Sequence, residues 1–286
     1  MTASLPRSLI YGLLLAAGTV LLFVGGPDYH ASRSLRHLWD LGHIAYFVLL
    51  AGLLVRIRFI KNMSVARQWA IILSITLLVG VSIELLQSGT SRMPDGRDVL
   101  RDVLGSVLVL VFGSPAAAIR RAGYYRYLRI GVLLALAVAL WPLAKSLIDE
   151  EIARRDFPLL SGFDTPFELD RWTGSAGRSI AAIPEISDSR LMEIALTGDR
   201  YSGVALEYFE GEWSSYRTLD LSLYNPDATP FHITCRIHDL AHIERGQAYE
   251  DRYNRSFLIS TGWNRIRINL AEVRSSPANR SMDMDR

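Results

Sequence analysis

The chain contains 286 residues, of which 50% are hydrophobic and 21% are charged, and its formal net charge at pH 7 is +2. The arginine residues stand in short clusters between apolar runs and form no basic face, so we expect no nucleic-acid partner. The single cysteine, Cys235, excludes a disulfide within the chain.

Hydrophobic residues are concentrated in residues 1–148, whereas residues 149–286 are mixed and polar. A bilayer core of ~30 Å requires roughly 20 apolar helical residues to cross it. The first apolar run follows Arg7 but lacks a small-x-small cleavage site, so we interpret it as a retained helix and not as a signal peptide. We predict about five transmembrane helices, one in each of the runs Ser8–Val24, Leu38–Val55, Trp69–Gln87, Val99–Ile119 and Leu128–Ile148.

The positions of arginine and lysine predict the orientation, because short cytoplasmic loops are enriched in them. The loop after the second run has the sequence RIRFIKNMSVAR, and the loop after the fourth has the sequence RRAGYYRYLR. With five crossings, both loops lie in the cytoplasm together with the N-terminus. Residues 88–97 and everything after Ile148 are then outside, which in a two-membrane bacterium is the periplasm. We therefore expect a multi-pass protein of the inner (plasma) membrane.

Ionisable residues within membrane helices are costly, so each one calls for an explanation. Three of the runs carry polar residues spaced three or four positions apart, so that each set shares one face of its helix. In the predicted topology the three sets lie at the same depth, a turn or two below the outer surface. We therefore predict an outward-facing polar pocket lined by Asp40, His43, Tyr46, Glu84, Gln87, Arg92, Asp98 and Asp102.

These residues also have structural interpretations. Glu84 can pair with an arginine of the following loop, and Asp98 stands where a helix N-cap belongs. Asp102 lies one turn deeper and does not cap the same helix end. Arg92 is an anchor for an anionic ligand or a solvated loop residue. His43 and the carboxylates offer nitrogen and oxygen ligands, but no HExxH-type spacing supports a metal site, so we expect no metal and no other cofactor.

The third and fourth runs contain a stretch that resembles the signature of the VanZ-like family. The segment IELLQSGTSRMPDGRDVLRDVLGS is similar to it in order and spacing at Glu84, Gln87, Arg92, Asp98 and Gly105. The segment WDLGHIAYFVLLAGLL resembles the family's earlier Asp/His/aromatic element, with an Asp-to-His spacing of three instead of four. Asp102 stands where the family usually has Asn. The resemblance covers about residues 8–120 and implies an envelope protein of a family linked to teicoplanin-type glycopeptide resistance, with no assigned activity.

The second half of the chain is predicted to form a β-domain over residues 159–286, after a charged connector at residues 149–158. Apolar and polar residues alternate with period two in LDLSLYN, ITCRIHD and IRINLAEV, and TGDR, NPDATP and STGWN mark turns. This pattern favours an antiparallel, jelly-roll-like β-sandwich. Its predicted strands are Arg190–Thr197, Gly203–Phe209, Tyr216–Tyr224, Phe231–His238, Ser256–Thr261 and Asn264–Leu270.

Residues 216–273 resemble jelly-roll domains of the galactose-binding type, including carbohydrate-binding modules, through LDLSLYNP, ITCRIHD and GWNRIRINLAEV. Because such domains usually end in a further strand, we expect the last strand of this one to be missing or supplied otherwise. The resemblance implies a glycan ligand. Trp172, Trp213 and Trp263 are candidate platforms for sugar rings, with places in the sandwich core as the alternative.

The sequence thus predicts a membrane all-α helical bundle followed by an all-β sandwich. The leading hypothesis is a non-enzymatic, VanZ-like envelope protein, linked to glycopeptide resistance or to a cell-surface polysaccharide, that binds a glycan or another envelope component. One alternative is an intramembrane enzyme that acts on a lipid-linked substrate, with His43 and Glu84 or Asp98 as acid and base. Another is a proton-coupled transporter, although the chain lacks an evident internal repeat. The expected partners are the lipid bilayer and a lipid-linked or glycan ligand, and the oligomeric state is left open.

Overall fold

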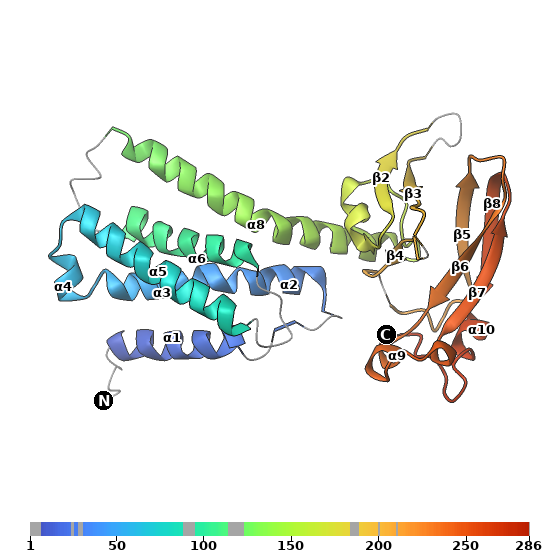
Figure 1. Ribbon diagram of the computed structural model, residues 1–286, viewed down its shortest axis with the longest axis horizontal. Coiled ribbons are helices and arrows are strands. Elements are labelled where there is room, and N and C mark those ends of the chain that lie inside the picture. Colours follow the sequence, from blue (N-terminus) through green and yellow to red (C-terminus); the bar gives the residue numbers. More distant parts are fainter. Residues whose placement is uncertain are drawn as a thin grey trace. The chain divides into compact units, whose positions relative to one another are not determined.

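The computed structural model divides into two compact units, residues 1–208 and residues 209–286. Helices dominate the first unit and strands the second, as Figure 1 shows along the sequence. A helical first part followed by a small β-sheet region is therefore confirmed. The residues that the structure describes are 7–23, 26–27, 31–87, 95–113, 123–183, 189–199, 201–209 and 211–285.

The apolar runs of the first unit form helices. Among the described residues, three helices are long and apolar enough to cross a membrane: Arg33–Leu54, Val65–Gln87 and Tyr125–Asp156. The first apolar run forms a shorter helix, and the described part of the fourth ends at Gly113. The elements are α1 (Arg7–Phe23), α2 (Arg33–Asp40), α3 (Gly42–Leu54), α4 (Arg58–Lys61), α5 (Val65–Gln87), α6 (Gly96–Leu108), the π-helix η1 (Val109–Gly113) and α8 (Tyr125–Asp156).

Local polar residues determine where several of these helices begin. The hydroxyl of Ser32 accepts a hydrogen bond from a backbone N–H in the first turn of α2 and caps this helix. The carboxylate of Asp95 caps α6 in the same way. The last helix of the unit, α8, continues through Pro142 as far as Asp156. Most of residues 149–158, which the sequence predicts as a connector, are therefore helical.

Two glycines allow close contact between the helices that carry polar residues. A Cβ atom added at Gly105 of α6 would lie 2.5 Å from the carbonyl oxygen of Ile44 and 3.1 Å from the Cβ atom of Phe47, both in α3. A Cβ atom added at Gly80 of α5 would collide with a carboxylate oxygen of Asp102 in α6. Because glycine lacks this atom, α3 and α5 both pack directly against α6 (Figure 1).

A buried carboxylate joins distant parts of the first unit. Asp149 of α8 accepts hydrogen bonds from the guanidinium groups of Arg33 in α2 and Arg171 in the 3-10 helix η2, with distances of 2.9 and 2.8 Å for Arg171. A fully buried carboxylate is tolerated only with such charged partners. The chain after α8 forms η2 (Pro166–Arg171), the antiparallel pair β1 (Trp172–Thr173) and β4 (Ala205–Leu206), and the antiparallel pair β2 (Gly177–Ala181) and β3 (Leu191–Ala195).

The second unit contains two antiparallel strand pairs around one hydrophobic core. β5 (Thr218–Asn225) pairs with β8 (Gly262–Asn269), and β6 (Phe231–Ile237) pairs with β7 (Tyr253–Ile259). Apolar and polar side chains alternate along β5 and β6, and their apolar faces pack on the same buried cluster. The strands that this alternation predicts are therefore confirmed, with ends shifted by a few residues. The remaining elements are α9 (Leu240–Glu244), the 3-10 helix η3 (Tyr249–Asp251) and α10 (Leu270–Arg274).

The close contact at Gly105 tests the helix packing. Gly105→Ala would place a methyl group against the backbone of Ile44, and overpacking of this kind typically costs about 1–3 kcal/mol. We expect this variant, purified in detergent, to unfold at a lower temperature than the wild type. Gly131→Ala in α8 is the matched control, because nothing lies within 4 Å of an added Cβ atom there. Equal melting temperatures for the two variants would contradict the described packing.

Candidate functional site

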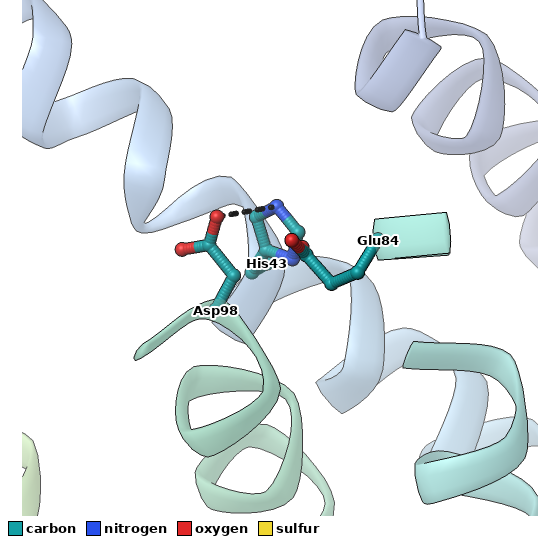
Figure 2. A group of neighbouring side chains, drawn as sticks. All are labelled: His43, Glu84 and Asp98. Atoms are coloured by element: carbon teal, nitrogen blue, oxygen red, sulfur yellow. Dashed lines mark ion pairs between the residues drawn. The ribbon is translucent and has the colours of Figure 1, made fainter. Parts of the chain in front are cut away.

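A group of polar side chains lies where the start of α3, the end of α5 and the start of α6 meet. His43 is the second residue of α3, Glu84 lies in the last turn of α5, and Asp98 and Asp102 occupy successive turns of α6. We call these four residues the polar cluster. Figure 2 shows Glu84 and Asp98 extending toward the imidazole of His43 from different helices. One ligand atom from each of these three side chains lies within 4.8 Å of the other two.

The N-cap of α6 determines which way Asp98 points. Asp98 does not cap this helix, so the interpretation of this residue as an N-cap is wrong. Asp95 is the cap, because α6 begins at Gly96, before the apolar run starts. Asp98 therefore lies within the first turn, where its carboxylate faces His43 at 3.7 Å instead of binding the free N–H groups of the helix end.

A hydrogen bond between His43 and Asp102 fixes the imidazole. The Nδ1 atom of His43 lies 2.9 Å from the Oδ1 atom of Asp102, and the two residues are 4% and 0% exposed. When Asp102 is ionised its carboxylate is an acceptor only, and Nδ1 is then the donor that carries the proton. The absent side chain of Gly80 leaves room for the second carboxylate oxygen of Asp102. In a neutral ring, the lone pair of Nε2 is then directed away from Asp102.

Two further carboxylates, those of Asp98 and Glu84, lie close to the imidazole. Nε2 of His43 lies 3.7 Å from Oδ2 of Asp98, the contact marked in Figure 2. Glu84 is 7% exposed, and its Oε2 atom accepts a 2.9 Å hydrogen bond from the backbone N–H of Asp95. Its Oε1 atom is buried and has no hydrogen-bond partner among the described residues. Glu84 therefore has an unused ligand atom in the cluster.

The charges of the cluster are only partly compensated. The guanidinium of Arg101 forms an ion pair with Asp98, and it also lies 3.5 Å from Asp40 at the margin of the cluster. Asp102 bonds to His43 but has one buried carboxylate oxygen without a partner among the described residues. At an effective dielectric constant of about 20, two like charges at the separation of Glu84 and Asp98 repel each other by roughly 3–4 kcal/mol. The site thus attracts positive charge.

The other predicted pocket residues have different surroundings. The hydroxyl of Tyr46 lies 3.1 Å from that of Thr19 in α1, and its ring packs on α1. The side-chain amide of Gln87 donates a 2.8 Å hydrogen bond to the carbonyl of Leu22, also in α1. Asp40 ends α2 and is partly exposed. Arg92 lies outside the described residues. The structure therefore brings together four of the eight predicted residues and directs two others toward α1.

Sequence reasoning missed two residues that shape the cluster. Gly80 was not singled out, although an isolated glycine inside an apolar helix often has a packing reason. Arg101 is the other, and its side chain forms an ion pair with Asp98, three residues before it in the same helix. The pair could have been predicted from the sequence, because Asp98 and Arg101 are three residues apart and such residues are neighbours on a helix surface.

The three tryptophans predicted as sugar platforms differ in exposure. Trp172 belongs to the first unit, where its ring N–H donates a 3.0 Å hydrogen bond to Ser161. Trp213 packs against the core of the second unit. Trp263 is 50% exposed on β8, and its ring centroid lies 5.5 Å from that of Tyr224, the opposite residue on β5. An exposed aromatic face is therefore present at Trp263.

A second polar group, in the β unit, is organised around one arginine. Arg280 donates hydrogen bonds to the carboxylates of Asp239 and Asp251 at 2.5–2.9 Å. Burial raises the pKa of Asp239, but the hydrogen bonds from Arg280 and from the backbone N–H groups of Asp283 and His242 together outweigh burial and leave this pKa below its ordinary value. The hydrogen bond from Arg280 also lowers the pKa of Asp251. We interpret this group as structural support for the chain's last residues.

Comparisons with models of protein families, with curated proteins and with solved structures found no match to this chain. The function must therefore be inferred from the geometry of the polar cluster. A buried imidazole that is hydrogen-bonded to one carboxylate and lies close to two others can bind a cation, accept a proton or orient a polar ligand.

Proposed function

We propose that this chain is an integral membrane protein of the cell envelope, similar to the VanZ-like family, whose polar cluster binds a lipid-linked or glycan component at the outer side of the membrane. One observation carries the proposal. His43, Glu84, Asp98 and Asp102 come from three apolar helices and meet in one buried place. Charged groups in membrane helices are costly and usually serve a ligand, an ion or a proton.

Helix lengths support five crossings. The 17 residues of α1 span about 26 Å, and the continuous helix from Gly96 to Gly113 spans about 27 Å. Both are close to the ~30 Å thickness of a bilayer core. Large apolar side chains are exposed along α5 and α8, as expected for surfaces that face lipid. They include Leu78, Leu85, Leu86, Leu134 and Val138.

The distribution of charge supports an outward-facing cluster. The basic residues Arg56, Arg58 and Lys61 follow the end of α3 that is remote from His43. Cytoplasmic loops are enriched in such residues, so this end of α3 is assigned to the cytoplasm. The other end, with His43, then lies toward the outside. The C-terminal end of α8 and the strands that follow it are outside in the same topology.

The chemistry of the cluster favours a hydroxyl-rich or positively charged ligand. Its carboxylate oxygens are hydrogen-bond acceptors, and Glu84 and Asp102 each have one buried oxygen that is unpartnered among the described residues. Sugar hydroxyls are donors that match such oxygens. The anionic phosphate of a lipid-linked glycan is repelled by the same oxygens, unless a cation is present.

The second candidate is an intramembrane enzyme that acts on a lipid-linked envelope substrate. The 2.9 Å hydrogen bond between His43 and Asp102 favours it, because it orients the ring and makes Nε2 the proton acceptor. Consumption of a lipid-linked glycan precursor by the purified protein, with turnover lost in His43→Ala, distinguishes this candidate from a binding protein.

The β unit is proposed to be a sandwich-type module that binds glycan through the outer face of β5 and β8. Trp263 and Tyr224 form an exposed aromatic pair on this face, and a flat apolar ring surface suits the faces of sugar rings. On the same face of β5 and β8, Asp220 accepts hydrogen bonds from Arg265 and Arg267. Those bonds hold the pKa of Asp220 well below its ordinary value, so its carboxylate stays charged.

Loss of the cluster carboxylates tests the leading proposal. Glu84→Gln and Asp98→Asn keep the side-chain size and remove the charge, so we expect folded protein that no longer alters the sensitivity of a bacterial host to teicoplanin or another glycopeptide. Glu151→Gln, at an exposed position near the end of α8, is the control and should behave as wild type. An unchanged phenotype for both cluster variants at normal membrane levels would remove the cluster from the function.

Reporter fusions test the topology. Alkaline phosphatase is active only outside the cytoplasm and green fluorescent protein fluoresces mainly inside it. We expect phosphatase activity from fusions after Arg97 and Asp156, and fluorescence from a fusion after Asn62, because the basic loop stays inside. Fluorescence from the fusion after Arg97 would place the polar cluster at the cytoplasmic side and reject the proposal.

Removal of the exposed aromatic ring tests the glycan face. Loss of an anchoring tryptophan commonly costs about 2 kcal/mol or more, so Trp263→Ala should raise the Kd for an envelope glycan roughly 30-fold or more. Binding is measured with the full-length protein on immobilised glycans. Tyr249→Ala removes another exposed aromatic ring, outside β5 and β8, and should bind as wild type. Equal affinities for wild type and Trp263→Ala would exclude this face.

A further inference from the structure

We infer that the polar cluster holds a divalent transition-metal ion through Nε2 of His43 and one carboxylate oxygen each from Glu84 and Asp98, with Asp102 orienting the imidazole. The inference concerns the same site as the proposed function and adds to it a cation that no motif in the sequence indicates. It depends on the geometry of four side chains and not on the identity of the ligand.

The distances fit a shared ion. Zinc binds histidine nitrogen and carboxylate oxygen at about 2.0–2.2 Å, so the ligand atoms of a tetrahedral site lie roughly 3.4 Å apart. Nε2 of His43 and Oδ2 of Asp98 are already 3.7 Å apart. One ligand atom each from His43, Glu84 and Asp98 lies within 4.8 Å of the other two, and Glu84 and Asp98 both extend toward the imidazole (Figure 2).

Two of the ligand atoms are free to bind. The buried Oε1 atom of Glu84 has no hydrogen-bond partner among the described residues, while Oε2 is held by the N–H of Asp95. This bond anchors the glutamate and leaves the other oxygen available. A neutral imidazole that donates from Nδ1 to the ionised carboxylate of Asp102 has the lone pair of Nε2 left for the metal.

The contact between His43 and Asp102 is typical of metal sites. A histidine ligand almost always donates its second ring N–H to a carboxylate, a carbonyl or water, which fixes the ring and raises its basicity. Asp102 is fully buried and provides this carboxylate at 2.9 Å. An asparagine at this position could also accept the hydrogen bond but has no negative charge to strengthen the imidazole.

The electrostatics of the cluster also favour a cation. Glu84, Asp98 and Asp102 lie close together among apolar helices, and Arg101 pairs with Asp98 alone of the three. A divalent ion would neutralise the remaining repulsion. A proton shared between the carboxylates is the other way to relieve it, and that possibility is the competing outcome of the experiment.

The donor set selects the kind of ion. One imidazole with two carboxylates suits Zn²⁺ or Mn²⁺ better than Ca²⁺ or Mg²⁺, which prefer oxygen ligands alone. Three protein ligands leave a coordination position for water or for an oxygen atom of a substrate. A phosphate of a lipid-linked glycan could bind there despite the surrounding carboxylates.

Metal binding is measured directly on the full-length protein in detergent, after removal of any affinity tag and treatment with EDTA. We expect calorimetric titration with Zn²⁺ to give about one ion per chain, and Zn²⁺ to raise the melting temperature. His43→Ala, Glu84→Gln and Asp98→Asn should each lose the high-affinity site. Asp102→Asn should weaken it by about 10–100-fold, because it changes only the orienting group. Glu151→Gln is the matched control and should bind as wild type.

Two results would overturn the inference. One is wild-type protein that binds neither Zn²⁺ nor Mn²⁺, which would favour a shared proton. The other is Glu84→Gln and Asp98→Asn variants that bind Zn²⁺ with wild-type affinity. The glycopeptide phenotype and the reporter fusions are scored separately, so the absence of a metal leaves the proposed function standing, and a failed phenotype leaves the metal site standing.

Discussion

The buried hydrogen bond between His43 and Asp102 is the constraint on which the helical unit depends. Both groups are removed from water, so each needs a partner inside the protein. The bond joins α3 to α6, and it forms because Gly105 lets the backbones of these helices approach and Gly80 leaves space for the carboxylate. The two glycines therefore allow the hydrogen bond between His43 and Asp102 to form. This bond in turn restricts how α3 and α6 can rotate about their axes.

Three buried carboxylates in this protein show how structural and functional charges differ. Asp149 is surrounded by two guanidinium groups, and Asp239 is bonded to Arg280, so each is compensated where it lies. Glu84, by contrast, has a buried oxygen without a partner among the described residues and a second carboxylate close by. A compensated charge can be explained by stability alone. A buried charge without a partner destabilises the folded protein. Binding of a ligand or an ion that neutralises this charge would explain why the residue is present.

The two units present different kinds of binding surface. The polar cluster lies within helices and offers few, closely spaced acceptor atoms, which suits an ion or a small polar group. The outer face of β5 and β8 offers the rings of Trp263 and Tyr224 with charged neighbours, which suits a broad and weakly bound surface such as a sugar chain. Both surfaces are compatible with ligands from the envelope, and each is tested without reference to the other.

The sequence by itself determined the helices, the strands of the second unit and the residue types of the cluster, because apolar runs, period-two alternation and spacings of three or four are local properties of the chain. Only the tertiary structure decided which polar residues meet. Tyr46 lies three residues after His43, and Gln87 lies three residues after Glu84, so the spacing places each pair on one side of its helix. The side chains of Tyr46 and Gln87 nevertheless contact α1, because residues one turn apart on a helix can face different neighbouring helices. Asp95 rather than Asp98 caps α6, because the helix starts before its apolar run. The contacts at Gly80 and Gly105 and the hydrogen bond between His43 and Asp102 join residues that are distant in sequence, and such contacts leave no periodic signal.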